Sequence, residues 1–300
     1  MAGKTDTFLE YRSLLFSIAY NMLGSVDAAE DLVQDTYLKW VDSRETDVRS
    51  IKSYLVKTIT HLCINYLNSA RLRRESYVGI WLPEPLQQYD VRRSSAGIES
   101  WHALSIGILI LLEKLTPQER AIFLLKEVFA YDYFELAVMF SKSEQNCRQI
   151  FKRAKDNLGK DTRRFEVDLK VHERVLNNFL QALTEGEMDE LIQLLQQDIT
   201  LFADGGGSVL QANGKKFTAA LNPIHGREHV GRLLQAVVLK MRRFVPAFTQ
   251  RVIIANGLPS ILTSSGEQAL SLISIEPEGD LIRNIYLQTN PDKLHSFRSI

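Results

Sequence analysis

Repeated helix-capping sequences between residues 115 and 155 constrain the fold of this chain more than any other feature. Thr116 is followed by a proline at the first helical position and by Glu119 at the third, the arrangement of a capped helix start. Asp132 and Glu135 repeat it farther along, and Ser143 supplies a third cap after a break. Short helices with such closely spaced starts are typical of a helix-turn-helix that reads duplex DNA.

The last helix of this motif has one apolar face and one polar face. Apolar residues recur at steps of three and four from Cys147 to Leu158, which predicts the buried stripe. The outward side chains are Gln145, Arg148, Gln149, Lys152, Arg153 and Lys155. Arginine can pair with guanine and glutamine with adenine, so we predict that the first four face base edges and the last two contact phosphates. The alternative is an ordinary solvated helix face.

The composition is that of a globular chain with reduced thiols. Of the 300 residues, 45% are hydrophobic and 24% are charged, and the length suggests two or three domains. The net charge of zero excludes a protein that coats nucleic acid by bulk attraction, so any DNA contact is local. Cys63 and Cys147 lack metal-ligand neighbours, and we expect core thiols. A polar start and no membrane-length apolar run predict a cytoplasmic protein without a membrane partner.

An acidic column marks the second helix predicted from the N-terminus, which begins after its capping residue Ser25. The residues expected in its buried face are Ala29, Leu32, Val33, Thr36 and Trp40. Asp27, Asp31 and Asp35 stand four residues apart on the other side, where each like-charged pair costs about 0.2–0.5 kcal/mol in an isolated helix. Such a column suggests a basic partner. A solvated face without a partner is the alternative.

The third predicted helix, at about 48–74, carries a face of amides. Its expected core stripe is Ile51, Leu55, Ile59, Leu62 and Tyr66. A second stripe contains His61, Asn65 and Asn68, with Lys57 and Arg71 at its flanks. Amides can bond base edges while the cations hold phosphates, so this helix can read exposed bases. A structural histidine and a solvated helix end are the alternatives.

Residues 76–100 separate the two helical segments, and the prolines in 81–85 (WLPEP) predict an extended linker. Before them, 19–25 (AYNMLGS) lead into 29–36 (AEDLVQDT). With these motifs in this order, residues 11–160 resemble an extracytoplasmic-function (ECF) sigma factor, and the second helix resembles the polymerase-binding helix of sigma region two.

The resemblance implies core RNA polymerase and promoter DNA as partners. The acidic column, with Gln34 beside it, would bind the coiled coil of the polymerase clamp. The minus-ten element, as melted DNA, would meet the third helix through Lys57, His61, Asn65, Asn68 and Arg71. The helix-turn-helix would be region four, which reads the minus-thirty-five element as duplex.

From about residue 170 the pattern changes. Amphipathic helices are expected at 171–183, 188–195 and 227–241, and a strand at 199–203. Four further β-rich runs with glycine turns between them are 248–255, 259–263, 268–275 and 281–287. This order predicts an α+β domain with a curved sheet, and it resembles a SnoaL-like domain.

Because SnoaL-like domains include enzymes, the residues able to catalyse need attention. His225 and His229 lie four apart, but Pro223 and Gly226 place the first outside a helix, which spoils a two-histidine metal face. Asp204 beside three glycines is more typical of a tight turn than of a general base. We expect no catalytic residue, no metal and no cofactor.

Three motifs resemble those of a sigma subgroup in which such a domain is permanently fused: the linker run 81–85, the turn 204–207 and the tail 290–294. Ser208 stands where that subgroup usually has a basic residue. The resemblance implies regulation in cis, with no separate anti-sigma factor inferred and a small-molecule ligand of the domain as a candidate partner. The implied contact residues are Trp81, Pro83, Asp204, Gly205, Gly206, Gly207, Asn290, Pro291 and Asp292.

The sequence thus predicts a multidomain protein with two all-α sigma domains and a C-terminal α+β SnoaL-like domain. The expected segments are region two at 1–75, a linker at 76–100, region four at 101–165 and the regulatory domain at 170–300. The expected function is promoter-specific transcription initiation. The alternatives are a ligand-sensing DNA-binding regulator that acts without polymerase, and an isomerase with a DNA-binding front end.

Overall fold

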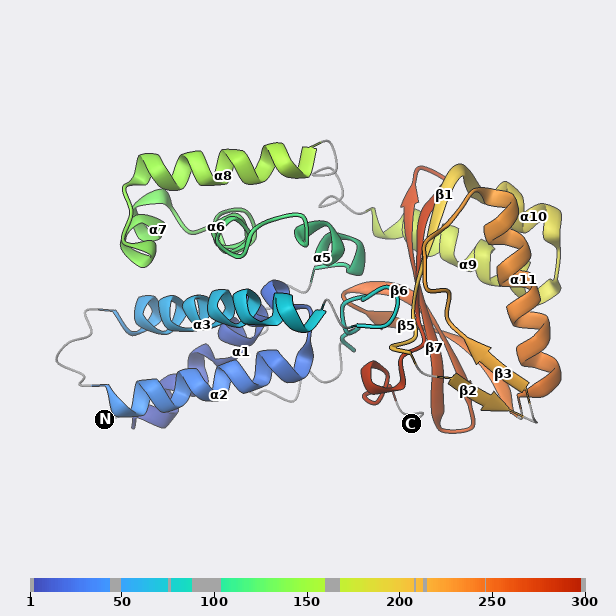
Figure 1. The fold of residues 1–300 in the computed structure, drawn as a ribbon, viewed down its shortest axis with the longest axis horizontal. Helices are drawn as coiled ribbons and strands as arrows, with labels where there is room; N and C mark the ends of the chain where they lie inside the picture. Colours follow the sequence, from blue (N-terminus) through green and yellow to red (C-terminus); the bar gives the residue numbers. More distant parts are fainter. Residues whose placement is uncertain are drawn as a thin grey trace. The chain divides into compact units, whose positions relative to one another are not determined.

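The computed structural model describes residues 3–43, 50–74, 77–87, 104–159, 168–207, 209–212, 215–245 and 247–297 (Figure 1). They form two compact units. The N-terminal unit contains the described residues up to Arg74, Leu104 and 108–159. The C-terminal unit contains 168–297 together with two segments from earlier in the chain, 77–87 and Ser105–Gly107. The linker therefore folds with the C-terminal domain, although it directly follows region two in sequence.

Three long helices begin the N-terminal unit. They are α1 (Lys4–Leu23), α2 (Val26–Asp42) and α3 (Ile51–Arg74). Gly24 ends α1 in the left-handed conformation, with φ of 67°, and the Ser25 hydroxyl then accepts from the Ala28 amide to start α2. This glycine-serine pair lets the chain reverse within two residues. The helices consequently pack side by side, with Leu15, Ile18, Leu55 and Trp40 almost fully buried.

The helix-turn-helix has the boundaries that its caps predict. Its helices are α5 (Ile106–Leu112), α6 (Pro117–Glu127), α7 (Tyr133–Phe140) and α8 (Glu144–Leu158). Thr116 with Glu119, and Asp132 with Glu135, form reciprocal capping boxes, and the Ser143 hydroxyl accepts from the Asn146 amide. Each cap satisfies backbone donors that a helix start otherwise leaves without partners.

The two helical segments pack together as one unit, through contacts between α1 or α3 and α6 or α7. The buried Arg120 of α6 donates from Nη1 to the Met22 carbonyl at 2.8 Å. The Nε2 of His61 on α3 bonds the Met139 carbonyl at 3.1 Å, and its ring stacks on Phe140. Arg120 also reaches Glu113 at 2.9 Å. Regions expected as separate domains therefore share an interface.

The C-terminal unit is an α+β domain. Its helices are α9 (Leu169–Glu185), α10 (Met188–Gln193) and α11 (Arg227–Phe244). Its strands are β1 (Leu195–Asp204), β2 (Val209–Ala212), β3 (Lys215–Thr218), β4 (Ile224–His225), β5 (Phe248–Ala255), β6 (Leu258–Ser265), β7 (Gln268–Glu278) and β8 (Leu281–Gln288). One sheet has the order β4-β1-β8-β7-β6-β5, and β2 pairs with β3. Only β1 and β8 are parallel among the described pairs.

Different segments of the chain cover the two faces of the six-stranded sheet. Helices α9, α10 and α11 lie against one face (Figure 1), where Phe179 of α9 and Val230 of α11 pack on the strand residues Ile199 and Ile285. On the other face, Leu294 and Phe297 of the C-terminal tail pack on Leu262 and Leu272. Because successive strand residues alternate between faces, the same strands hold both layers.

The expected fold class is confirmed, with two differences in detail. The first concerns the sheet: β1 extends beyond the predicted 199–203, and β2, β3 and β4 were not predicted, because strands this short leave little periodicity. The second concerns α3. The fully buried positions include Val56, Thr60 and Cys63, whereas Leu62 and Tyr66 of the predicted stripe are half-buried. Because α3 packs against α6 and α7 as well as α1 and α2, its buried face is rotated relative to the predicted stripe.

None of the helices among the described residues is long and apolar enough to span a bilayer.

His172 of α9 gives the domain a pH-dependent stability. Its Nε2 donates to the Pro259 carbonyl at 3.0 Å, and its Nδ1 is buried with no partner among the described residues. Burial lowers the pKa of His172 below its ordinary value of 6.5. Below pH 6.5, the His172 imidazole therefore binds a proton more readily in the unfolded chain than in the folded protein. The free energy of unfolding therefore falls as the pH drops from 6.5 through the folded pKa.

We predict an NMR titration midpoint below 6.5 for the imidazole of His172, and a lower urea midpoint for the C-terminal domain at pH 5.5 than at pH 7.5. The variant His172→Gln keeps a donor for Pro259 but does not titrate, so its midpoint should change less over this pH range. Equal pH dependence of the two proteins would contradict the prediction.

Candidate functional site

The carboxylate of Asp204, at the end of β1, is the centre of a polar cluster that holds the linker. The side chain is fully buried. Its Oδ1 accepts from the Tyr77 hydroxyl at 2.5 Å, and its Oδ2 accepts from the Leu82 amide at 2.9 Å and from Lys293 Nζ at 2.7 Å. Two linker residues and one tail residue thus meet on one carboxylate. We call Tyr77, Leu82, Asp204 and Lys293 the linker clamp.

Lys293 completes the clamp from the tail side. Its ammonium also donates to the Leu82 carbonyl at 2.6 Å. The same nitrogen lies 4.5 Å from the centre of the Trp81 ring and 5.1 Å from that of Tyr77. Aromatic faces attract cations, and the attraction grows when the cation is partly desolvated, as here, where 13% of the lysine side chain is exposed. Trp81 therefore contributes through its ring face.

Burial and the neighbouring carboxylate act in the same direction on Tyr77. Burial raises the pKa of the Tyr77 hydroxyl, and the hydrogen bond to Asp204 raises it further. The neutral phenol is the form that donates the proton to the carboxylate. The hydroxyl also accepts from Asn290 Nδ2 at 3.1 Å, which ties the start of the tail to the same cluster.

The glycine turn after Asp204 is shaped by close approach of the tail. Gly206 has φ of +56°, and a Cβ there would lie 2.4 Å from Asn290 Nδ2, so a larger residue would be strained and would displace the Asn290 side chain. Gly207 has φ of +74°, and a Cβ there would lie 3.3 Å from Val78 Cβ of the linker, a tight but less severe approach. The Gly206 amide donates to Asp204 Oδ1 at 3.0 Å. The predicted tight turn is therefore present, and its aspartate holds other segments as well.

Two further contacts attach the chain on either side of residues 88–103 to the sheet. Asn256, in the β5–β6 turn, exchanges two hydrogen bonds with Leu86: its amide donates to the Leu86 carbonyl at 2.8 Å and its Oδ1 accepts from the Leu86 amide at 2.9 Å. A Cβ at Gly107 would lie 3.0 Å from both Glu276 Oε2 and the Tyr286 hydroxyl. The domain therefore contacts the chain before and after residues 88–103.

The structure brings Trp81, Asp204 and Asn290 of the predicted contact set together. Pro83 is buried in the linker, and Pro291 and Asp292 form the 3-10 turn η4 (Pro291–Lys293), which Asn290 caps. Ser208 lies outside the described residues. Sequence reasoning missed Tyr77 and Lys293 as partners. The only sign of Lys293 in the sequence is that it is the single cation of the tail motif 290–294, which is otherwise typical of a turn.

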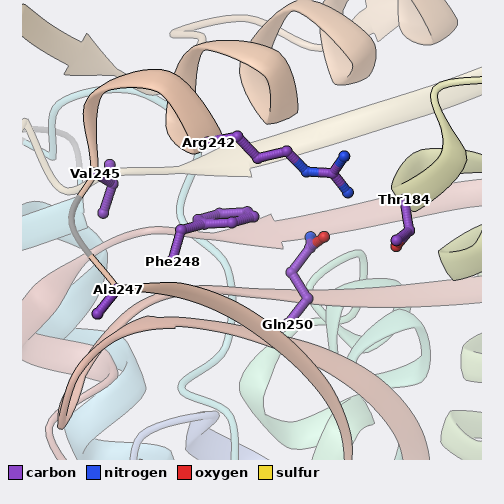
Figure 2. A pocket seen from close by; sticks show the side chains of 6 residues that line it. All are labelled: Thr184, Arg242, Val245, Ala247, Phe248 and Gln250. Atoms are coloured by element: carbon purple, nitrogen blue, oxygen red, sulfur yellow. The ribbon is translucent and has the colours of Figure 1, made fainter.

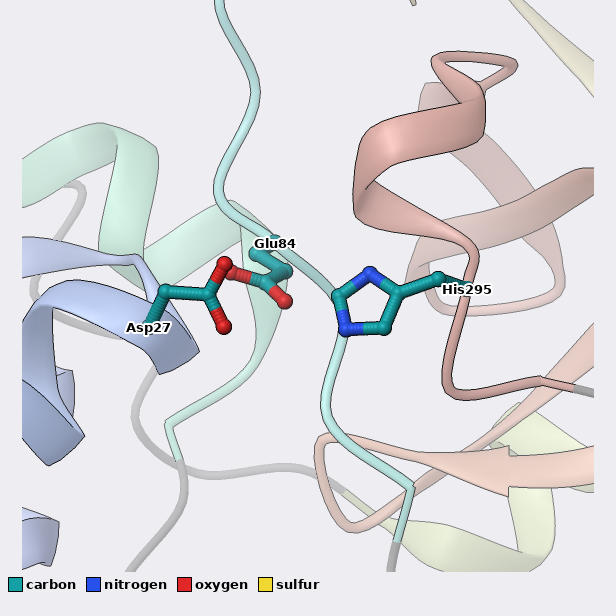
Figure 3. A group of neighbouring side chains, drawn as sticks. All are labelled: Asp27, Glu84 and His295. Carbon is teal, nitrogen blue, oxygen red and sulfur yellow. The ribbon is translucent and has the colours of Figure 1, made fainter.

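The described residues do not assemble a metal or catalytic centre in the C-terminal unit. Figure 3 shows Glu84 of the linker near His295 of the tail. Two ligands are fewer than a protein metal site needs, and Asp27, the third residue drawn, belongs to the other unit. His225 bonds the Thr200 hydroxyl, and His229 bonds the His225 carbonyl, so this pair makes local contacts.

The acidic column on α2, formed by Asp27, Asp31 and Asp35, is exposed, and so is the neighbouring Gln34. The neighbouring Glu30 has a partner in Arg12, at 2.6 Å. In contrast, Asp31 and Asp35 have no ion pair in the part of the chain that the structure describes. Their mutual repulsion is therefore not offset by contacts seen within the unit.

The two predicted DNA-facing helices, α3 and α8, differ in how far contacts within the chain involve the side chains of their polar faces. On α8 the six predicted residues are exposed, although Arg148 pairs with Glu144 at 2.9 Å and Lys155 with Glu127 at 3.2 Å. On α3, Asn65 and Asn68 are exposed and Lys57 is half-buried, whereas His61 is held by α7. The side chain of Arg71 lies outside the described residues.

Comparison with known proteins identifies the family. The Sigma-70 region 2 family matches residues 7–73, and the Sigma-70 region 4 family matches 108–158. The ECF RNA polymerase sigma factor SigJ of Mycobacterium tuberculosis is 30% identical over 237 residues, which cover 78% of this chain and 73% of that protein. The chain belongs to the ECF sigma factors.

Two further similarities extend over the whole length of this sigma factor. The probable ECF sigma factor SigI of M. tuberculosis is 23% identical over 300 residues, with 96% of this chain and 94% of that protein covered. The crystal structure of M. tuberculosis SigJ matches with a TM-score of 0.73 and 24% identity, over 97% of this chain and 98% of the other, which shows a shared fold. The C-terminal α+β domain is thus part of a shared architecture.

Membership of the ECF sigma factor family decides between the functions that the sequence left open. Sigma factors bind core RNA polymerase and promoter DNA, and they are not enzymes. The interpretations as a polymerase-independent regulator and as an isomerase with a DNA-binding front end are therefore wrong.

We predict that Asp204→Asn destabilises the C-terminal unit by on the order of 3 kcal/mol, because it leaves the largely buried Lys293 without its counterion. Asp280→Asn is a matched control, since Asp280 pairs with Arg174 but is 79% exposed, and it should cost less than about 1 kcal/mol. Urea unfolding of both full-length variants measures the difference, and equal losses would show that the ion pair between Asp204 and Lys293 is not stabilising.

Proposed function

We propose that the C-terminal domain of this sigma factor regulates transcription in cis by holding the linker between regions two and four. The observation that carries the proposal is the linker clamp, in which the buried Asp204 and Lys293 bind both main-chain groups of Leu82. Main-chain binding fixes the path of the linker whatever the side chains around it. The domain can therefore set how far the linker reaches.

A promoter requires the two DNA-reading regions to stand apart. The names of the minus-ten and minus-thirty-five elements imply about 25 base pairs between them, or roughly 85 Å of duplex at about 3.4 Å per base pair. In the N-terminal unit His61 of α3 touches α7 directly. Binding of melted bases by His61 requires that contact to break.

The free length of the linker decides whether the regions can separate. With 77–87 and Ser105–Gly107 held by the C-terminal domain, the sixteen residues 88–103 remain between them. Their extended length of roughly 55 Å is not available to separate the two regions while the domain holds the chain at both ends of this segment. Release of the eleven residues 77–87 adds roughly 37 Å. Opening of the clamp would therefore allow both elements to be bound.

The switch has a defined energetic scale. Moving a two-state equilibrium from mostly closed to mostly open requires about 5.5 kcal/mol of differential binding. Polymerase, promoter DNA or a small ligand can supply it, provided that each binds the open state more tightly. Regulation by its own domain would leave this sigma factor with no requirement for a separate anti-sigma protein.

The residue assignments complete the proposal. Asp27, Asp31, Gln34 and Asp35 of α2 would bind the basic coiled coil of the polymerase clamp. Lys57, His61, Asn65, Asn68 and Arg71 of α3 would bind the melted minus-ten element. Gln145, Arg148, Gln149, Lys152, Arg153 and Lys155 of α8 would bind the minus-thirty-five duplex. The exposure of the α2 acids, without ion pairs to other described residues, supports the first set.

We predict that reversing Asp31 and Asp35 to Lys abolishes binding to core polymerase and leaves the fold intact, because exposed substitutions usually change stability by no more than about 0.5 kcal/mol. The control variant Glu10→Lys/Glu173→Lys makes the same change in net charge at exposed positions outside the column. A pull-down with core polymerase separates the two. Binding by the soluble Asp31 and Asp35 variant would reject the assignment.

We predict that Lys293→Gln and Trp81→Ala alter the amount of transcript made with core polymerase but not the promoter chosen, because they loosen the clamp and leave α3 and α8 unchanged. Lys170→Gln, at an exposed lysine on α9, is the control and should behave as the wild type. Hydrogen exchange at the Leu82 amide verifies that the clamp has opened. Unchanged transcription with an opened clamp would refute cis regulation.

A further inference from the structure

A pocket of about 470 Å³ opens at the C-terminal ends of α9 and α11 and the start of β5 (Figure 2). It lies within the C-terminal unit. Its lining combines three polar and three apolar side chains: Thr184, Arg242, Gln250, Val245, Ala247 and Phe248. The linker clamp uses none of them.

The polar side chains converge on one space. Figure 2 shows the Arg242 guanidinium, the Gln250 amide and the Thr184 hydroxyl directed toward one another across the pocket. Within the described ranges these three side chains make no hydrogen bond and no ion pair. Five guanidinium N–H donors, an amide and a hydroxyl therefore remain available to a ligand.

The apolar part of the lining is held in place by packing within the domain. Val245 is 7% exposed and packs with Phe248 against Met241 and Leu270, while the Phe248 ring keeps part of its surface toward the pocket. Ala247, between them, has φ of 47°, a left-handed conformation that is unfavourable for a non-glycine residue. Such strain concentrates where a structure positions groups for binding.

We propose that this pocket binds a small monocarboxylic acid with an apolar body. The guanidinium would hold the carboxylate in a paired hydrogen bond, the geometry for which arginine is suited. Gln250 and Thr184 would complete the carboxylate's hydrogen bonds, and Phe248 and Val245 would cover the apolar body. A cationic ligand is disfavoured, because the lining has one cation and no acid.

Binding is the role that the lining supports. The six residues that line the pocket include no carboxylate, histidine or cysteine, so they offer no general base, nucleophile or usual metal ligand. The ligand would leave as it entered. This separates the site from catalysis by enzymes of similar fold.

The strand β5 connects the pocket to the linker. Phe248 and Gln250, at its start, line the pocket, and Ala255, at its end, pairs with Gln87 of the linker. Asn256, the next residue, holds Leu86. A ligand that shifts the start of β5 would therefore act on the strand that carries the linker. This coupling rests on the proposed function, whereas the binding itself does not.

The test is a calorimetric titration of the full-length protein with 3-phenylpropionate. We expect saturable binding with a dissociation constant on the order of a millimolar, which is usual for a ligand of this size. Arg242→Gln should weaken it at least tenfold. The control is Arg243→Gln, since Arg243 is exposed, adjacent, and placed over the Phe244 ring outside the pocket lining. The neutral analogue 3-phenylpropanamide should bind at least tenfold more weakly.

Absence of saturable binding overturns the site, and so does equal affinity for Arg242→Gln or for the amide. Hydrogen exchange at the Leu86 amide, with and without saturating 3-phenylpropionate, tests the coupling, and no change on binding overturns that step. Failure of the proposed function appears elsewhere, in transcription by Lys293→Gln without any ligand.

Discussion

The buried carboxylate of Asp204 is the interaction on which the arrangement of the C-terminal unit depends. It joins the end of β1, the linker and the tail, three segments that are far apart in the sequence. A buried ion pair alone often gives little net stability, because both ions lose water. Here amide and hydroxyl donors share the carboxylate, and aromatic rings cover the ammonium. The cluster thus selects one path for the linker.

A polar contact would suit the opening of the linker clamp that we propose. The loss of one partner from a buried pair costs about 3–5 kcal/mol, which is similar to the free energy that a two-state switch requires. A contact made only of large apolar side chains would expose its surface to water on opening and favour aggregation. Lys293 and Asp204 would regain hydration on separating, so the proposed open state would not carry that penalty.

Local signals in the sequence were sufficient for the helices and insufficient for the clamp. Thr116, Asp132 and Ser143 cap helices through neighbours three residues away, so their effect is visible in the sequence. The residues around Asp204 predicted only a turn, and its contact with the linker was implied by the family resemblance alone. Its partner Tyr77 lies 127 positions away, a separation without local pattern. His61 was likewise assigned from its own helix, while its contact with Met139 comes from packing of distant helices.

The linker, the glycine turn and the tail belong to one polypeptide, which has a consequence for dosage. Intramolecular partners meet at an effective concentration that the tether sets, commonly millimolar for short flexible connections. Each molecule therefore carries its own clamp in a fixed one-to-one ratio. If the domain regulates in cis as we propose, overproduction of the sigma factor would not outnumber its regulator, and dilution during growth would not remove it. Under that proposal, only a change in the affinity of the linker clamp itself, by ligand or partner, would alter the active fraction.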